Sequence, residues 1–160
     1  MSSKRKILTV LSILAIFFLV AVGLNERIKQ HRKFISVFSQ MVISTDDALV
    51  SFSIIDEKYL KGEETKENYE KAWYDLNYQL KQIEEQDDKL LSPPKDLEEL
   101  LALYRAGFYR VFSVTNNVVD YLSGETKDSM IIVKDREKFE EGLKLLKEVK
   151  DKLQSSEKVT

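Results

Sequence analysis

The chain has 160 residues, a formal net charge of −2, no cysteine and one histidine. Its five glycines and two prolines are too few for the turns of a β-sandwich or β-barrel, so the composition favours an all-α fold. The missing cysteines exclude disulfides, thiol catalysis, Cys-ligated zinc and a lipidated cysteine, and a single histidine excludes a paired-histidine metal centre.

The first element in chain order is an apolar segment, residues 7–24, whose only polar side chains are Thr9 and Ser12. A helix of this length spans about 27 Å, close to the thickness of the hydrocarbon core of a bilayer. We therefore predict a transmembrane anchor over 7–24, preceded by a basic tail over 1–6. The alternatives are a secretory signal cleaved near Ala21-Val22-Gly23 and a buried soluble helix.

A basic juxtamembrane flank follows over 25–33. Its four cations are predicted to contact anionic lipid head groups, or alternatively to form a solvated flank: Arg27, Lys29, Arg32 and Lys33. Because basic residues lie on both sides of the span, the positive-inside rule gives no clear orientation of the span in the membrane. The short basic tail resembles an export signal, so we expect a single-pass protein of the cell membrane with an extracytoplasmic body, or a secreted one if the signal is cleaved.

The body of the chain is acidic. Residues 1–33 hold seven basic and one acidic side chain, which leaves 18 basic and 26 acidic residues in the remainder, a formal charge of −8. An acidic body without a basic stripe repels phosphate backbones, so nucleic acid is not an expected partner.

After residue 33 the apolar residues alternate at spacings of four and three, which is typical of amphipathic helices and of coiled-coil packing. We predict an antiparallel up-down four-helix bundle over 34–155, followed by a flexible tail over 155–160. The expected helices are 34–61, 66–91, 93–123 and 129–154. Gly62 and Gly124 are expected to end the first and third helices, Thr65 to cap the second, and the pair Pro93-Pro94 to open the third.

The first bundle helix is unusually apolar. Between Phe34 and Ile55 its only charges are Asp46 and Asp47, and Ile43 and Val50 lie toward the back of the seam formed by the other apolar residues. Two readings stay open: this helix is the most enclosed one of the monomer, or it offers a surplus face to a second copy or another membrane protein.

Two groups of acidic residues are candidates for a chemical role such as cation binding. Asp46 and Asp47 are adjacent and point about 100° apart on a helix, so they do not clasp one ion. The run Glu84, Glu85, Asp87 and Asp88 is either a weak divalent-cation site or a solvated face, and Asp87 occupies a position where the spacing calls for an apolar residue. We expect no metal, cofactor or catalytic residues.

Aromatic residues form a second candidate surface. They are expected to line a ligand pocket between helices or to contact a partner, unless they are ordinary core: Trp73, Tyr74, Tyr78, Tyr104 and Tyr109. Of these, Tyr74, Tyr78 and Tyr109 are expected to lie beside the core seam rather than in it. Ala106-Gly107 is expected to permit the close approach of a neighbouring helix.

The layout resembles a group of small envelope proteins of low-GC Gram-positive bacteria that have an N-terminal anchor and a lysine-rich helical bundle. The resemblance rests on Lys4-Arg5-Lys6, the apolar span to Leu24, and the segment 92–100, in which a proline pair opens an aromatic helix. Members commonly carry a lipidated cysteine, which this chain lacks. The resemblance implies a membrane location and an all-α body, but no common activity.

Two functions are compatible with the sequence. We favour a non-enzymatic interaction module in the cell envelope, with a protein partner or a second copy docked on the bundle. The alternative is a bundle that senses a small molecule and signals through a partner membrane protein. Because no nucleophile and base can be paired, we do not expect an enzyme.

Overall fold

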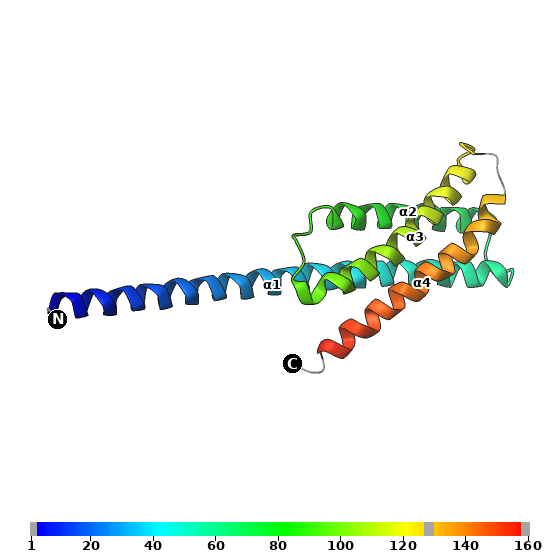
Figure 1. The fold of residues 1–160 in the computed structure, drawn as a ribbon. Helices are drawn as coiled ribbons and strands as arrows, with labels where there is room; N and C mark the ends of the chain where they lie inside the picture. Colours follow the sequence, from blue (N-terminus) through cyan, green and yellow to red (C-terminus); the bar gives the residue numbers. More distant parts are fainter. Residues whose placement is uncertain (1–2, 127–129, 158–160) are drawn as a thin grey trace. The chain divides into compact units, whose positions relative to one another are not determined.

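The computed structural model describes residues 3–126 and 130–157, and the side chains of residues 22–126 and 135–155. Within this part, helices account for nearly every residue: α1 over Ser3–Leu60, α2 over Lys66–Asp87, α3 over Glu98–Leu122 and α4 over Met130–Glu157 (Figure 1). A short 3-10 helix, η1, covers Lys95–Leu97. No strand occurs in the described residues, which confirms the predicted all-α class with four helices.

The chain divides into two compact units, residues 1–36 and 37–160. The boundary falls within α1, so residues 3–36 of this helix belong to the first unit and residues 37–60 to the second. The second unit holds the four-helix bundle.

The predicted membrane anchor, residues 7–24, lies in the first unit. In the described part of the chain, no helix holds a stretch long and apolar enough to cross a bilayer. Residues 7–21, most of the predicted span over 7–24, have side chains outside the described set. The anchor therefore stays a prediction.

The helix ends follow the chemistry expected from the sequence. Gly62 and Gly124 have φ angles of 74° and 80°, in the left-handed region that glycine adopts without strain, and they follow the ends of α1 and α3. Thr65 caps α2 because its side-chain oxygen accepts a hydrogen bond from the backbone N–H of Asn68 at 3.2 Å. These three sequence predictions are confirmed.

The connection between α2 and α3 is longer than expected. α2 ends at Asp87 rather than at residue 91, and α3 begins at Glu98 rather than at residue 93. Pro94 has an extended ψ of 146°, and its carbonyl accepts a hydrogen bond from the N–H of Leu97 at 2.9 Å. The proline pair therefore precedes η1, with Pro94 at its N-cap, and does not open α3 directly. The start predicted for the fourth helix, Ser129, lies outside the described residues.

Contacts between α1 and α2 show that these helices run in opposite directions. The rings of Tyr59 and Tyr69 stack with centroids 4.1 Å apart, and those of Phe52 and Trp73 lie 4.4 Å apart. As residue numbers fall along α1, those of the contacting residues rise along α2. The tight connection around Gly62 produces this antiparallel hairpin.

The remaining neighbours are also antiparallel. Across α2 and α3, Asn77 donates to Asn116 at 2.6 Å and Asp87 pairs with Arg105. Across α3 and α4, Lys138 donates to Ser113 at 2.8 Å and Asn117 donates to Asp135, and Figure 1 shows these two helices side by side. On the opposite side of the bundle, Lys150 of α4 donates to Asp46 of α1 at 2.6 Å. The second unit is therefore an up-down-up-down bundle.

The core of the bundle consists of one seam from each helix. The buried side chains of α1 keep the predicted spacing, and we call this set the inner seam: Phe38, Met41, Thr45, Ala48 and Phe52. It packs against equivalent rows on the other helices: Leu76, Leu80 and Ile83 on α2, Leu101, Tyr104, Phe108, Val111 and Val118 on α3, and Leu146 and Val149 on α4. Burial of these apolar side chains is the main source of stability, at about 25 cal/mol for each Å².

Candidate interaction surface

α1 carries a second row of residues with the same spacing as its inner seam. Ile43, Asp47, Val50 and Ile54 follow one another at intervals of four, three and four, and we call them the outer seam. Because each residue turns the helix by about 100°, the outer seam lies opposite Thr45, at the centre of the inner seam. α1 is therefore apolar on two opposed sides.

The apolar side chains of the outer seam are open to solvent. Ile43 is 53% exposed, Val50 is 50% exposed and Ile54 is 51% exposed. The sequence left open whether this helix is enclosed by the bundle or offers a surplus apolar face. These three residues form a surplus apolar face, because the bundle does not enclose them. An exposed row on one helix face is a feature of interaction surfaces, whereas scattered exposed apolar residues need no explanation.

Small serines flank the outer seam. Ser51 Oγ donates to the carbonyl of Asp47 at 2.8 Å, and Ser53 Oγ donates to the carbonyl of Val50 at 2.8 Å. Both hydroxyls are therefore satisfied by the backbone of their own helix. Their short side chains leave the row accessible to a neighbouring element.

Asp47 is the one charged member of the outer seam, and it is exposed. Its neighbour Asp46 points toward α4 and pairs with Lys150, whereas the Asp47 carboxylate makes no hydrogen bond or ion pair within the described residues. The Asp46 carboxylate accepts a hydrogen bond from the Lys150 ammonium and attracts its charge, which raises the pKa of Lys150 above its usual range. The sequence places both aspartates on one helix but does not indicate the Asp46–Lys150 pair, which depends on the register of α4.

A groove with an apolar floor runs beside the outer seam, between α1 and α4. It holds two adjoining hollows of about 160 and 290 Å³, and the Asp46–Lys150 pair lies against both. Ile43 belongs to the wall of the smaller hollow together with Val42 and Leu153, so the outer seam is continuous with the groove. The larger hollow extends to Leu49 on α1 and to other residues of α4: Leu143, Leu146, Lys147 and Asp151.

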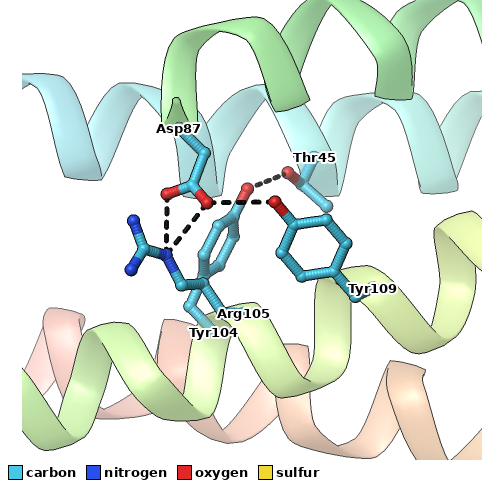
Figure 2. A network of polar contacts seen from close by, with 5 residues as sticks. All are labelled: Thr45, Asp87, Tyr104, Arg105 and Tyr109. Carbon is cyan, nitrogen blue, oxygen red and sulfur yellow. Dashed lines mark hydrogen bonds and ion pairs between the residues drawn. The ribbon is translucent and has the colours of Figure 1, made fainter. Parts of the chain in front are cut away.

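A polar network joins α2 to α3 at the other side of the bundle. Figure 2 shows the carboxylate of Asp87 facing the Arg105 side chain, whose Nε donates to both carboxylate oxygens at 3.0 and 2.9 Å. The Tyr109 hydroxyl donates to the same carboxylate at 3.4 Å. Asp87 is only 3% exposed, so Arg105 and Tyr109 supply the compensation that a buried carboxylate needs. The acidic run of α2 is thus not a uniformly solvated face, because one of its members is a buried structural group.

Tyr104 lies beside this network and ties α3 to α1. Its hydroxyl is 2.9 Å from the hydroxyl of Thr45, which donates to the carbonyl of Met41 and therefore accepts from Tyr104 (Figure 2). Burial raises the pKa of Tyr104 well above its usual value of 10.0. Burial also raises the pKa of Tyr109, with a further contribution from the negative charge of Asp87.

The five aromatic residues of the candidate surface differ in burial. Tyr104 is fully buried, which corrects its assignment to a surface, because its ring packs edge-on against Phe38 at 5.5 Å. Trp73 is half-buried in an aromatic cluster with Phe52. Tyr74, Tyr78 and Tyr109 are exposed at 42%, 66% and 39%.

The basic flank in the first unit is accessible. All four cations of the predicted head-group contact are exposed: Arg27, Lys29, Arg32 and Lys33. The Lys29 ammonium pairs with Glu26 at 3.1 Å, one turn away on the same helix. Such an exposed pair contributes little to stability, so it does not prevent Lys29 from contacting an anionic surface.

Chemistry-bearing clusters are scarce in the described part of the chain. Among those residues, no group of three or more His, Cys, Asp or Glu side chains is placed to hold a metal ion. Every buried side-chain nitrogen or oxygen there has a hydrogen-bond partner. The buried polar groups are therefore engaged within the fold.

Comparisons with known proteins provide no family assignment. No protein-family model matches the chain, and no curated protein or solved structure is significantly similar to it.

Proposed function

We propose that this chain is a non-enzymatic protein-interaction module, anchored to the cell membrane by residues 7–24, with its bundle outside the cytoplasm. Its function is to bind a partner protein at the outer seam of α1. The observation that carries this proposal is the row of three half-exposed aliphatic side chains, Ile43, Val50 and Ile54, opposite a complete inner seam.

The energetics favour a covered outer seam. Moving a half-exposed Ile or Val side chain fully out of water is favourable by about 1 kcal/mol, on the basis of about 25 cal/mol for each Å². Three such residues in one row, next to the α1/α4 groove, form the kind of apolar centre around which interfaces are built. Core packing does not explain them, because α1 already fills its core positions with Phe38, Met41 and Phe52.

The membrane part of the proposal rests on the sequence of residues 7–24 and on the exposed cations that follow it. A single apolar helix with an adjacent basic cluster combines hydrophobic insertion with attraction to anionic head groups. The acidic body, with its formal charge of −8, is repelled by the same lipids. This charge division favours a protein over an anionic lipid surface as the binding partner of the bundle.

The size of the native assembly tests the interaction. Full-length chain extracted from its own membranes in a mild non-ionic detergent is expected to elute in a complex heavier than one chain. The triple variant Ile43→Ser, Val50→Ser, Ile54→Ser is expected to elute as a single chain. A matched control, Leu60→Ser, Tyr78→Ser, Leu91→Ser, removes three exposed apolar side chains elsewhere in the second unit and is expected to keep the complex. A wild-type chain that elutes alone would contradict the proposal.

A small-molecule sensor is the second candidate, and the hollows of the α1/α4 groove favour it. The larger, of about 290 Å³, is lined by Leu49 and Leu143 together with Lys147 and Asp151, so it offers a small molecule apolar walls and charges of both signs. Native mass spectrometry of the full-length chain discriminates between the two. A retained small molecule that is lost in Leu143→Arg favours the sensor, whereas a protein adduct lost in Val50→Ser favours the interaction module.

A further inference from the structure

We infer that the occupant of the outer seam is an amphipathic helix of a different protein, with a lysine or arginine placed opposite Asp47 between its apolar residues. This inference rests on the proposed function and specifies the partner at the same surface. Three observations support it: the spacing of the outer seam, the charge of Asp47, and the poor fit of a second copy of this chain to the outer seam.

The spacing indicates a helix rather than a strand or a loop. The four–three–four intervals of the outer seam repeat those of the inner seam, which packs against helices of the bundle. This interval keeps a row of side chains in line with a neighbouring helix, whereas an extended strand presents every second residue. The flanking Ser51 and Ser53 are short, so a helix backbone can approach α1 closely.

Asp47 specifies the charge of the partner. It lies between Ile43 and Val50 in the row, so any helix that covers these two side chains also covers the carboxylate. Its carboxylate makes no hydrogen bond or ion pair within the described residues, and Lys150, the α4 cation that its charge reaches, is already bonded to Asp46 at 2.6 Å. A carboxylate covered by an apolar surface without a partner is costly, so the complementary helix must carry a cation.

A second copy of this chain fits poorly because its outer seam contains no cation. If two outer seams paired in parallel, Asp47 would face Asp47. In the antiparallel register that matches all four positions, Ile43 packs on Ile54 and Asp47 packs on Val50 of the second copy. A shift that brings Asp47 to Lys58 of the second copy places Ile54 opposite Ser51. In these registers, pairing of two outer seams therefore satisfies either the apolar side chains or the charge, but not both.

Two synthetic peptides test the inference with the full-length chain in phosphatidylcholine nanodiscs, a lipid without net charge. Both are amphipathic helices with leucines at positions matching Ile43, Val50 and Ile54, and they differ only in a lysine or a glutamate opposite Asp47. Fluorescence anisotropy of the labelled peptides is expected to give a dissociation constant about tenfold lower for the lysine peptide.

Two substitutions locate the binding. Asp47→Lys is expected to invert the preference, so that the glutamate peptide binds more tightly, whereas Asp75→Lys, the same change on an exposed position of α2, leaves the preference unchanged. Val50→Ser is expected to weaken both peptides at least about tenfold. Leu60→Ser, on α1 but outside the outer seam, is expected to have no effect.

The outcomes separate the inference from the proposed function. Equal binding of the two peptides, or a preference that Asp47→Lys does not invert, overturns the inference and leaves the interaction function standing. Concentration-dependent dimers of the chain that are lost in Val50→Ser also overturn it, because the occupant is then a second copy. If neither peptide binds and the native assembly is a single chain, the inference and the proposed function are both contradicted.

Discussion

Gly107 of α3 and Gly142 of α4 face each other across the closest helix pair of the bundle. A Cβ at Gly142 would lie 2.8 Å from Val111 Cγ2 and 2.9 Å from the carbonyl oxygen of Gly107, and a Cβ at Gly107 would lie 3.0 Å from the carbonyl oxygen of Gly142. Real Cβ atoms essentially never come closer than 3.0 Å to other atoms, and 3.0 Å is already tight, so the two helices are in contact through their backbones. The sequence predicted a close approach at Gly107 and did not identify Gly142.

A methyl group at this contact is expected to weaken the bundle. Gly142→Ala gains about 1 kcal/mol of helix propensity but forces the backbones of α3 and α4 apart, and overpacking of this kind costs about 1–3 kcal/mol. The expected net loss is about 1 kcal/mol in the free energy of unfolding, measured by urea denaturation of the full-length chain in mild detergent. Lys144→Ala, an exposed change on the same helix, serves as the control. A more stable Gly142→Ala variant would show that the helices separate at no cost.

Removing the cation from the buried pair is expected to cost more. Arg105→Ala leaves the Asp87 carboxylate buried with only the Tyr109 hydroxyl, and an orphaned buried charge typically costs about 3–5 kcal/mol. Because Arg105 is itself 43% exposed and water can enter, we expect the lower end, about 3 kcal/mol, in the same urea assay. A loss below about 1 kcal/mol would mean that water already compensates Asp87.

An apolar replacement of the whole pair is expected to restore stability. Asp87 occupies a core position of α2, so Asp87→Leu completes the apolar row that ends at Ile83. Combined with Arg105→Met, it should return the bundle to within about 1 kcal/mol of wild type, because buried ion pairs are often replaceable by apolar residues of similar volume. A double variant as unstable as Arg105→Ala would show that the pair has a structural role that apolar packing does not fill.

The raised pKa values of Tyr104 and Tyr109 make stability sensitive to alkaline pH. Both groups are neutral in either state below about pH 10, so their contribution is constant there. Above about pH 10 the unfolded chain loses these protons first, and stability falls as pH rises toward the higher pKa values of the folded state. The slope is up to about 1.4 kcal/mol per pH unit for the buried Tyr104 and smaller for Tyr109, because Tyr109 is 39% exposed and solvent screens its charge.

Tyr104→Phe isolates the buried group. It is expected to be less stable than wild type at neutral pH, because the hydrogen bond to Thr45 is lost, and to show a shallower decline above about pH 10. Tyr78→Phe, at a position 66% exposed, is the matched control and should decline as wild type does. Identical declines in wild type and Tyr104→Phe would contradict the assignment of the slope to burial.

The anchor is testable on intact cells. The full-length chain is expected to stay in the membrane pellet after alkaline carbonate extraction, and Ile16→Arg combined with Phe17→Arg should release it, because each arginine near the middle of a span costs about 3 kcal/mol. Protease added outside the cell should remove the bundle, and the mass of the mature chain decides whether the segment is cleaved. A wild-type chain in the soluble fraction at full length would contradict the anchor.

The periodicity of the sequence was sufficient to predict four helices and most of the core, because amphipathic spacing is a local property. It also flagged Asp87 as a misfit in an apolar row and Ile43 and Val50 as surplus apolar residues. It did not find Ile54 as part of the same exposed row. The apolar residues of α2 alone also did not indicate that the helix ends at Asp87, where the segment before the proline pair leaves helical geometry.

The sequence did not predict which residues of neighbouring helices contact each other. The contacts Asp46–Lys150, Asp87–Arg105 and Gly107–Gly142 depend on how far each helix slides and rotates against its neighbour. Single-helix patterns do not contain this information, and side chains with equivalent spacing fit several registers. Tyr104 illustrates the limit, because the aromatic pattern allowed both a contact surface and ordinary core, and the packing of α3 against α1 places it in the core.

A photo-crosslinking scan along α1 in living cells tests the central claim most directly. A photoreactive amino acid is placed at each position from residue 43 to residue 54 of the full-length chain, and adducts are identified by mass spectrometry. We expect adducts to one partner helix at positions 43, 47, 50 and 54, with low yield on the inner-seam side. An absence of adducts at these four positions, or equal yields all around the helix, would contradict a binding surface on the outer seam.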